Sequence, residues 1–142
     1  MLEEAIRLAV LAHRGQKDKA GQPYILHPLR VMLGLDSDEA KIVGVLHDVV
    51  EETSVSFAEL RKVGFGDTVL DALDSLTLRE GEAYEAYIER VLENPLATQV
   101  KRVDLVDNMD IRRLSSQPTG RDWARLGKYR LAYERLLHHR PK

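Results

Sequence analysis

The sequence contains no cysteine, and this absence removes several kinds of site at once. Disulfide bonds, thiolate zinc sites and cysteine nucleophiles are all excluded, so any bound metal must use nitrogen and oxygen ligands. Long apolar runs are also missing, since no stretch approaches the roughly 18 residues that cross a bilayer. The early charges are acidic and polar residues recur at helical spacing, unlike a signal peptide, so we expect a cytoplasmic protein without a membrane partner.

An excess of charge of one sign is equally absent. The 21 basic and 23 acidic residues leave a formal net charge of −2, which provides no general electrostatic reason to bind nucleic acid. A phosphorylated ligand would need a local cluster of basic side chains. With 142 residues, 44% hydrophobic and 31% charged, we expect one globular domain at residues 1–137 and a short basic tail at 138–142. Whether identical copies associate stays open.

Helical periodicity dominates the pattern of apolar residues. They recur at three- and four-residue steps, and strand-like alternation of useful length is lacking. We therefore predict an all-α, single-domain bundle of seven or eight helices. Pro28 suits the first turn of a helix, and we expect it to keep His27 outside the helical region. The expected helices cover residues 28–33, 38–52, 57–63, 67–76, 82–93, 95–114 and 122–138, after a first helix at 2–14.

The segment HDVVEET, residues 47–53, concentrates ionisable groups inside an apolar stretch. On a helix His47 and Glu51 share one face, as do Asp48 and Glu52. Burying carboxylates and an imidazole among valines is costly unless a cation compensates them, and a divalent ion would do so. The alternative is that both glutamates lie at a solvated helix end while His47 is a hydrogen-bonded core residue.

A second segment, VKRVDLVDNMDIRRL at residues 100–114, places Lys101, Asp104 and Asn108 on one stripe of a helix. A carboxylate for a metal, an amide for a sugar or base and an ammonium for a phosphate could then face one cleft. The alternative is a solvated face on which Asp104 pairs with Lys101 or Asn108. Taken alone, His27 and His13 are more often structural histidines than ligands.

Three segments together resemble a known family. GQKDKAGQPYILHP (15–28), LHDVVEET (46–53) and VKRVDLVDNM (100–109) occur in the order seen in the HD-type hydrolase domain of RelA/SpoT homologues. The likeness covers residues 1–137 and is strongest to the stand-alone small alarmone hydrolases of the metazoan SpoT-homologue type. The resemblance implies an enzyme, a metal-dependent phosphoric-ester hydrolase of the HD superfamily. Its implied partner is a small phosphorylated nucleotide, a guanosine polyphosphate that loses pyrophosphate from its 3′ position.

The resemblance also implies a cofactor and roles for particular residues. One divalent ion, usually manganese, would be held by His27, His47, Asp48 and Asp104; hard ligands without a thiolate suit Mn²⁺, although another divalent ion stays open. Glu51 and Glu52 match the acidic pair that handles the attacking water and the departing oxygen, with Glu51 assigned to the water and Glu52 to proton delivery. The implied substrate contacts are Lys19, Lys101, Asn108, Arg125 and Tyr129.

Three positions depart from the family pattern. Asp18 and Asp110 stand where arginine is usual, and Leu78 stands where lysine is usual. Each lost charge-assisted contact to a base or phosphate removes about 1.5–3 kcal/mol of affinity. Two alternatives to an alarmone hydrolase are therefore open: a phosphohydrolase for a different nucleotide or phosphorylated metabolite, and a non-catalytic module that binds a nucleotide or metal.

Overall fold

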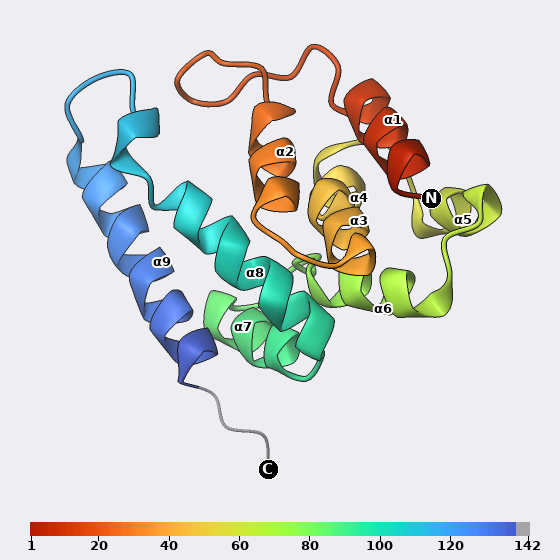
Figure 1. The fold of residues 1–142 in the computed structure, drawn as a ribbon. Helices are drawn as coiled ribbons and strands as arrows, with labels where there is room; N and C mark the ends of the chain where they lie inside the picture. The colour runs from red at the N-terminus through yellow and green to blue at the C-terminus, as the bar shows by residue number, and fades with distance from the viewer. Residues whose placement is uncertain (139–142) are drawn as a thin grey trace.

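The computed structural model describes residues 1–138, which fold into packed helices (Figure 1). The elements are α1 (Leu2–Ala12), α2 (Leu26–Leu33), α3 (Asp38–Leu46), α4 (Val49–Glu52), α5 (Phe57–Val63), α6 (Asp67–Ser75), α7 (Tyr84–Leu92), α8 (Pro95–Asn108), the 3-10 helix η1 (Ile111–Arg113) and α9 (Gly120–Leu137). The described residues form no sheet, only an isolated antiparallel bridge between Lys17 and Pro23, so the predicted all-α fold is confirmed. The expected basic tail at 138–142 lies outside the described residues apart from His138.

The middle of the molecule is built on α2, α3 and α8, which pack against one another. Helix α1 covers α3, whereas α7 and α9 pack on α8, and Figure 1 shows α8 running between α2 and α9. Within residues 1–138 no helix combines the length and the apolar character that a bilayer span requires.

Two glycines allow the central helices to approach closely. A Cβ atom at Gly34 would stand 2.7 Å from Cγ1 of Val103 on α8, and a Cβ atom at Gly44 would stand 2.7 Å from Cδ1 of Leu35. Because real Cβ atoms do not tolerate such contacts, a larger residue would require the Val103 or the Leu35 side chain to shift. The glycines thus allow α2 to pack close to both α3 and α8.

Helix starts follow the expected capping chemistry. The side chains of Ser37, Ser56 and Asn94 accept hydrogen bonds from backbone N–H groups three residues later and cap α3, α5 and α8. Thr119 and Asp122 form a reciprocal capping box at α9. Each such cap contributes about 1 kcal/mol, and together they define where the chain enters each helix.

The predicted helix over 38–52 is wrong in one respect, because it divides into α3 and α4 at His47 and Asp48. The His47 Nδ1–H donates to the Gly44 carbonyl at 2.5 Å. In a continuous helix that carbonyl would accept from the Asp48 N–H, so the side chain competes with the helical ladder. The break changes the direction in which Asp48 and the residues after it leave α3.

Two further boundaries differ from expectation. His27 lies inside α2, because Pro28 is the third residue of that helix, where a missing N–H removes no intrahelical hydrogen bond. Helix α8 ends at Asn108 rather than near Leu114. The Asp110 carboxylate accepts from the Arg112 N–H and caps η1 instead, so a local side-chain bond ends the longer helix.

Candidate metal centre

Three buried polar side chains from distant parts of the chain converge beneath the surface. His27 comes from α2, His47 follows the end of α3, and Asp104 comes from α8. The Oδ1 atom of Asp104 lies 2.8 Å from Nε2 of His27 and 3.1 Å from Nε2 of His47. One ligand atom from each residue lies within 4.8 Å of the others, a grouping that can hold a metal ion.

Asp48 brings a second carboxylate to the same two imidazoles. Its Oδ2 atom is 3.1 Å from Nε2 of His47 and 3.7 Å from Nε2 of His27. The Tyr24 hydroxyl donates to this oxygen at 2.5 Å, a contact that the sequence did not reveal. Tyr24 belongs to the PYILHP stretch, and its partner became apparent only once the fold joined residues 24 positions apart.

The outer nitrogen of each imidazole is already engaged. The Nδ1–H of His27 donates to Oδ2 of Asp107 at 2.6 Å, and the Nδ1–H of His47 donates to the Gly44 carbonyl at 2.5 Å. With Nδ1 protonated, a neutral imidazole directs the lone pair of Nε2 toward the carboxylates, whose oxygens are also acceptors. Lone pairs that face one another in this way need a proton or a cation between them. Metal-binding histidines are commonly oriented by such hydrogen bonds from Nδ1. The donor set therefore fits a divalent ion.

The pKa values of the cluster reflect this concentration of opposite charges. Burial lowers the pKa of His47, but the carboxylates of Asp48 and Asp104 outweigh burial and leave that pKa well above its usual range. Burial likewise opposes the charge of Asp48, but His47 brings the pKa of Asp48 down to about 2. Burial also opposes the charge of Asp104, but Lys101 and His47 bring its pKa well below the usual range, so both aspartates are held as carboxylates, the form that binds metal.

Asp104 is oriented by two further residues of its own helix. The Lys101 ammonium donates to Oδ2 of Asp104 at 2.8 Å, and the Asn108 amide donates to Oδ1 at 3.1 Å. Asp104 therefore pairs with both Lys101 and Asn108, as their spacing on the helix suggested. This face of the helix is not solvated, however, because Asp104 is only 3% exposed. The Lys101 ammonium also lies 5.2 Å from the centroid of the Tyr87 ring, so its positive charge interacts with both the Asp104 carboxylate and this ring.

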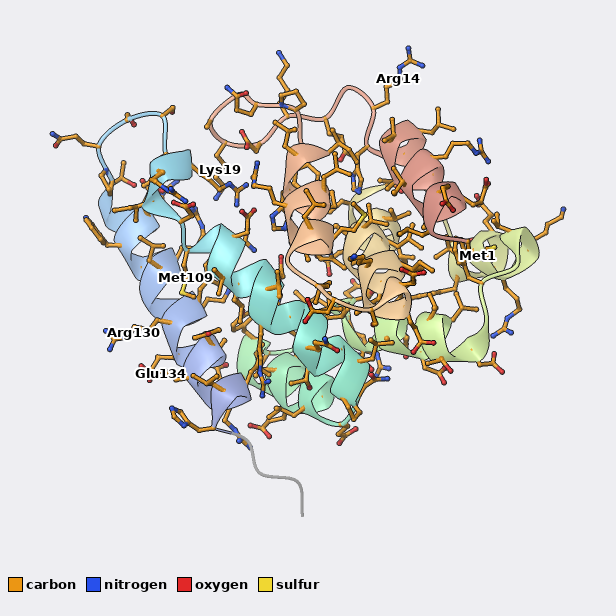
Figure 2. All side chains as sticks on the ribbon, in the orientation of Figure 1. Met1, Arg14, Lys19, Met109, Arg130 and Glu134 are labelled. Atoms are coloured by element: carbon orange, nitrogen blue, oxygen red, sulfur yellow. The ribbon has the colours of Figure 1, made fainter. Side chains whose placement is uncertain are left out.

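A cleft of about 510 Å³ opens over the cluster, a size suited to a small molecule. Of the predicted site residues, only His47 is absent from its lining; the others are His27, Asp48, Glu51, Glu52, Asp104, Lys19, Lys101, Asn108, Arg125 and Tyr129. Figure 2 places Lys19 on the loop that precedes α2, on the side toward η1 and α9. Lining residues that sequence reasoning missed include Tyr24, Tyr84, Tyr87, Arg113 and Lys128.

The acidic pair lies at the edge of this cleft, on α4. The carboxylate of Glu51 accepts a hydrogen bond from the Leu78 N–H at 2.8 Å, and burial raises the pKa of Glu51. The Glu52 carbonyl accepts from the Gln16 side chain at 2.8 Å. Arg90 donates to the Thr77 carbonyl at 2.8 Å and so helps to hold the loop that carries Leu78. Hydrogen bonds from two different segments of the chain therefore hold the acidic pair in place.

The residues that depart from the family pattern also line the cleft. Oδ1 of Asp18 accepts from the N–H groups of Ala20 and Gln22, both at 2.9 Å, and its Oδ2 lies 3.7 Å from the guanidinium of Arg113. Asp110 caps η1 as described above. Both acids therefore stabilise their own turns, and their charges still face the cleft.

Asp107, which sequence reasoning did not single out, supports the cluster from behind. Its carboxylate accepts from His27 at 2.6 Å and from the Arg30 guanidinium at 2.8 Å, and it also pairs with Arg113 at 3.1 Å. One local indication of this role was present in the sequence: Asp107 follows Asp104 by three residues, so both lie on one face of the helix.

Comparisons with known proteins agree with this architecture. No family model matches the chain. The chain is 37% identical over 121 residues to a GTP pyrophosphokinase of Streptomyces coelicolor, covering 76% of this chain and 14% of the relative. It is 31% identical over 121 residues to a guanosine-3′,5′-bis(diphosphate) 3′-pyrophosphohydrolase of Aquifex aeolicus, covering 76% of this chain and 17% of the relative. The chain thus spans a small part of the length of these relatives.

A solved structure shares the fold. It is that of a metazoan orthologue of SpoT, a protein that hydrolyses ppGpp and plays a role in starvation responses. It matches with a TM-score of 0.76 at 23% sequence identity, and the match covers 96% of this chain and 85% of that one. The likeness extends over nearly the whole helical arrangement.

Proposed function

We propose that this chain, which resembles the HD-type hydrolase domain of RelA/SpoT homologues in sequence and in fold, is a metal-dependent phosphohydrolase acting on an alarmone nucleotide. The reaction removes pyrophosphate from the 3′ position of guanosine 3′,5′-bis(diphosphate) or a close relative, in the cytoplasm. The observation that supports it most directly is the convergence of two imidazole Nε2 atoms on the carboxylates of Asp48 and Asp104 at the floor of a cleft.

His27, His47, Asp48 and Asp104 would hold the ion, for which we propose Mn²⁺ on the basis of their nitrogen and oxygen donors. When bound, a divalent ion lowers the pKa of water and offsets phosphoryl charge. Asp107 and the Gly44 carbonyl keep both imidazoles turned inward. Lys101 holds Asp104 and limits the negative charge of the cluster.

Glu51 and Glu52 handle protons in this proposal. Burial raises the pKa of Glu51, which makes its carboxylate a better proton acceptor than an exposed glutamate. The Leu78 N–H keeps the Glu51 carboxylate directed at the cleft, where it orients water, and Glu52 delivers the proton to the departing oxygen. The nucleotide is bound by five residues that all line the cleft: Lys19, Lys101, Asn108, Arg125 and Tyr129.

The test is direct. Full-length protein loaded with Mn²⁺, its metal content measured by mass spectrometry, is incubated with ppGpp, and the nucleotides are separated by ion-exchange chromatography. We expect GDP and pyrophosphate in equal amounts, and no products from the Asp48→Ala variant. Metal-loaded protein that leaves ppGpp intact would refute the proposal.

A second candidate keeps the metal chemistry and changes the substrate. The observation that favours it is the presence of two acids, Asp18 and Asp110, in the lining of the cleft. A screen of nucleotides and phosphorylated metabolites tests it, and a strong preference for ppGpp counts against it. A non-catalytic binding module predicts instead that Asp48→Ala loses binding or stability and that the wild-type protein turns over no compound in the screen. Size-exclusion chromatography with light scattering decides whether copies associate.

A further inference from the structure

Three lysines of the cleft lining, Lys17, Lys19 and Lys128, have no ion-pair partner within the described structure, whereas the other basic residues of the lining do. Lys101 pairs with Asp104, and Arg125 pairs with Asp122 at 3.3 Å. Lys128, on α9, lines the same cleft, and no carboxylate lies within ion-pair distance of it among residues 1–138. Its ammonium lies instead 4.1 Å from the centroid of the Tyr84 ring. Of the three lysines, the exposed Lys128 is thus the one that an aromatic face positions within the described residues.

The hydroxyl of Tyr84 is also without a partner. Its oxygen is buried and makes no hydrogen bond within the described residues, and the side chain lines the cleft. Tyr84 is the first residue of α7, which packs against α9, so the two side chains meet where these helices form one wall of the cleft. A phenol that lacks a partner can donate to an incoming oxygen atom, and leaving such a group unpaired is unfavourable.

The position of the pair within the cleft indicates which part of a ligand it meets. Tyr84 and Lys128 also line a second hollow of about 330 Å³ between α7 and α9. None of the proposed metal ligands and neither member of the acidic pair lines that hollow. The pair therefore lies where the cleft borders this second hollow.

We propose that Tyr84 and Lys128 form a binding position for the phosphate groups of the nucleotide that the reaction does not cleave. This inference rests on the proposed function and extends it to substrate recognition. The Tyr84 hydroxyl donates to a phosphate oxygen, and Lys128 supplies the compensating charge. The aromatic ring holds the ammonium in place before the ligand arrives, which reduces the entropy lost on binding.

Binding of GDP and of guanosine to the Mn²⁺-loaded full chain tests this inference by isothermal titration calorimetry. GDP carries the 5′-diphosphate but no 3′-phosphate, so the proposed reaction does not consume it. We expect the wild-type protein to bind GDP about tenfold more tightly than guanosine, because a charge-assisted hydrogen bond has about that effect on affinity. Lys128→Met and Tyr84→Phe should each remove most of this preference and leave guanosine binding unchanged.

The matched control is Arg130→Met, on the same helix. Figure 2 shows Arg130 and Glu134 on the outer side of α9, where they pair at 3.2 Å, so this variant removes a similar charge outside the cleft. It should retain the preference for GDP. Melting temperatures of all three variants report whether each is folded, and Tyr84→Phe keeps the aromatic ring in any case.

Two results would overturn the inference: wild-type protein that binds GDP no more tightly than guanosine, or variants that keep the full preference. Equal losses for both ligands would also overturn it, since they indicate a general disturbance of the cleft. If the variants lose the preference but ppGpp is not cleaved, the phosphate position stands and the proposed function fails. If ppGpp is cleaved and its KM is the same in both variants, the proposed function stands and this inference fails.

Discussion

The inner end of the cleft, formed by His27, His47, Asp48 and Asp104, differs from its rim, where Asp18, Leu78 and Asp110 lie. Each inner side chain makes at least two polar contacts, and at least one of these reaches a different element of the fold. The two acids of the rim bond mainly within their own turns. All three departures from the RelA/SpoT pattern fall at the rim. A residue whose contacts are local can change with little consequence for the fold, whereas an inner residue cannot.

Replacing Asp104 by alanine should break the inner cluster most severely. The variant removes the carboxylate that lies against His27 and His47 and that accepts from Lys101 and Asn108, and it leaves the Lys101 ammonium in a buried position without a carboxylate. Loss of one partner from such a pair costs about 3–5 kcal/mol of stability. Urea unfolding measures the change in free energy, and mass spectrometry measures metal content, which should fall to background. Asp110→Asn, at the rim, should change stability by less than about 1 kcal/mol.

Removing the metal should weaken the whole protein but leave the fold in place. A ligand that binds only the native state adds about 2.7 kcal/mol at a concentration 100 times its Kd. Chelation should therefore lower the melting temperature, and Mn²⁺ should restore both the melting temperature and the hydrolysis of ppGpp. The same melting temperature with and without Mn²⁺ would contradict the assignment of the inner cluster as a metal site.

Asp107→Asn tests the support behind His27. An amide oxygen can still accept from Nδ1 of His27, but it lacks the charge that strengthens the imidazole as a ligand. Changes of this kind typically reduce metal affinity about 10- to 100-fold. A fluorescent competition assay for Mn²⁺ measures the affinity. Arg30→Met is the matched control, because it removes another partner of Asp107 and keeps the bond to His27.

The same residue provides a pH-dependence test in metal-free protein. Burial raises the pKa of Asp107, but hydrogen bonds from His27 and Arg30 outweigh burial and bring it to about 2, below its ordinary value of 3.8. Since the folded-state pKa is lowered, the stability contributed by Asp107 is complete above the ordinary value. It should be lost as the pH falls from about 4 to 2. Curves of unfolding free energy against pH should converge for the wild type and Asp107→Asn at the acidic end; parallel curves would argue against this role.

Leu78→Lys should have the smallest effect and should act on binding alone. Leu78 is 42% exposed, so stability should change by less than about 0.5 kcal/mol, and its backbone N–H still holds Glu51. An added surface cation near a phosphate contributes about 0.4–1 kcal/mol, which corresponds to a twofold to fivefold lower KM for ppGpp with kcat unchanged. The control variant is Leu78→Met, which places an unbranched side chain at this position without adding a charge. A change in kcat of the same size would show that the rim also affects the chemical step.

Local sequence was sufficient to predict most of the helices. The positions of helices α5 to α7 followed from apolar periodicity, which acts over three or four neighbours, and at α5 a capping serine also marks the start. The break at His47 did not follow, because it depends on an imidazole that bonds to the carbonyl three residues earlier. Whether a histidine turns toward its own backbone or toward solvent is decided by what packs around it.

The candidate site shows the same division. The resemblance of three segments to a known family, rather than spacing alone, nominated His27, His47, Asp48 and Asp104, and the fold brings the four together. The roles of Tyr24, Tyr84, Asp107 and Lys128 did not emerge from the sequence. Each acts through a contact with a residue on another segment, and a single sequence carries no record of such contacts.

What the sequence by itself determined was the class of the fold, the donor types open to a metal and the segments that carry them, because these follow from short-range periodicity and residue chemistry. Tertiary structure alone decided which nitrogen of each imidazole faces the cluster, which acid supports it from behind and which cation of the cleft lies over the Tyr84 ring. These properties depend on the close approach of α2 to α3 and α8, and of α7 to α9, which packing rather than local propensity brings about.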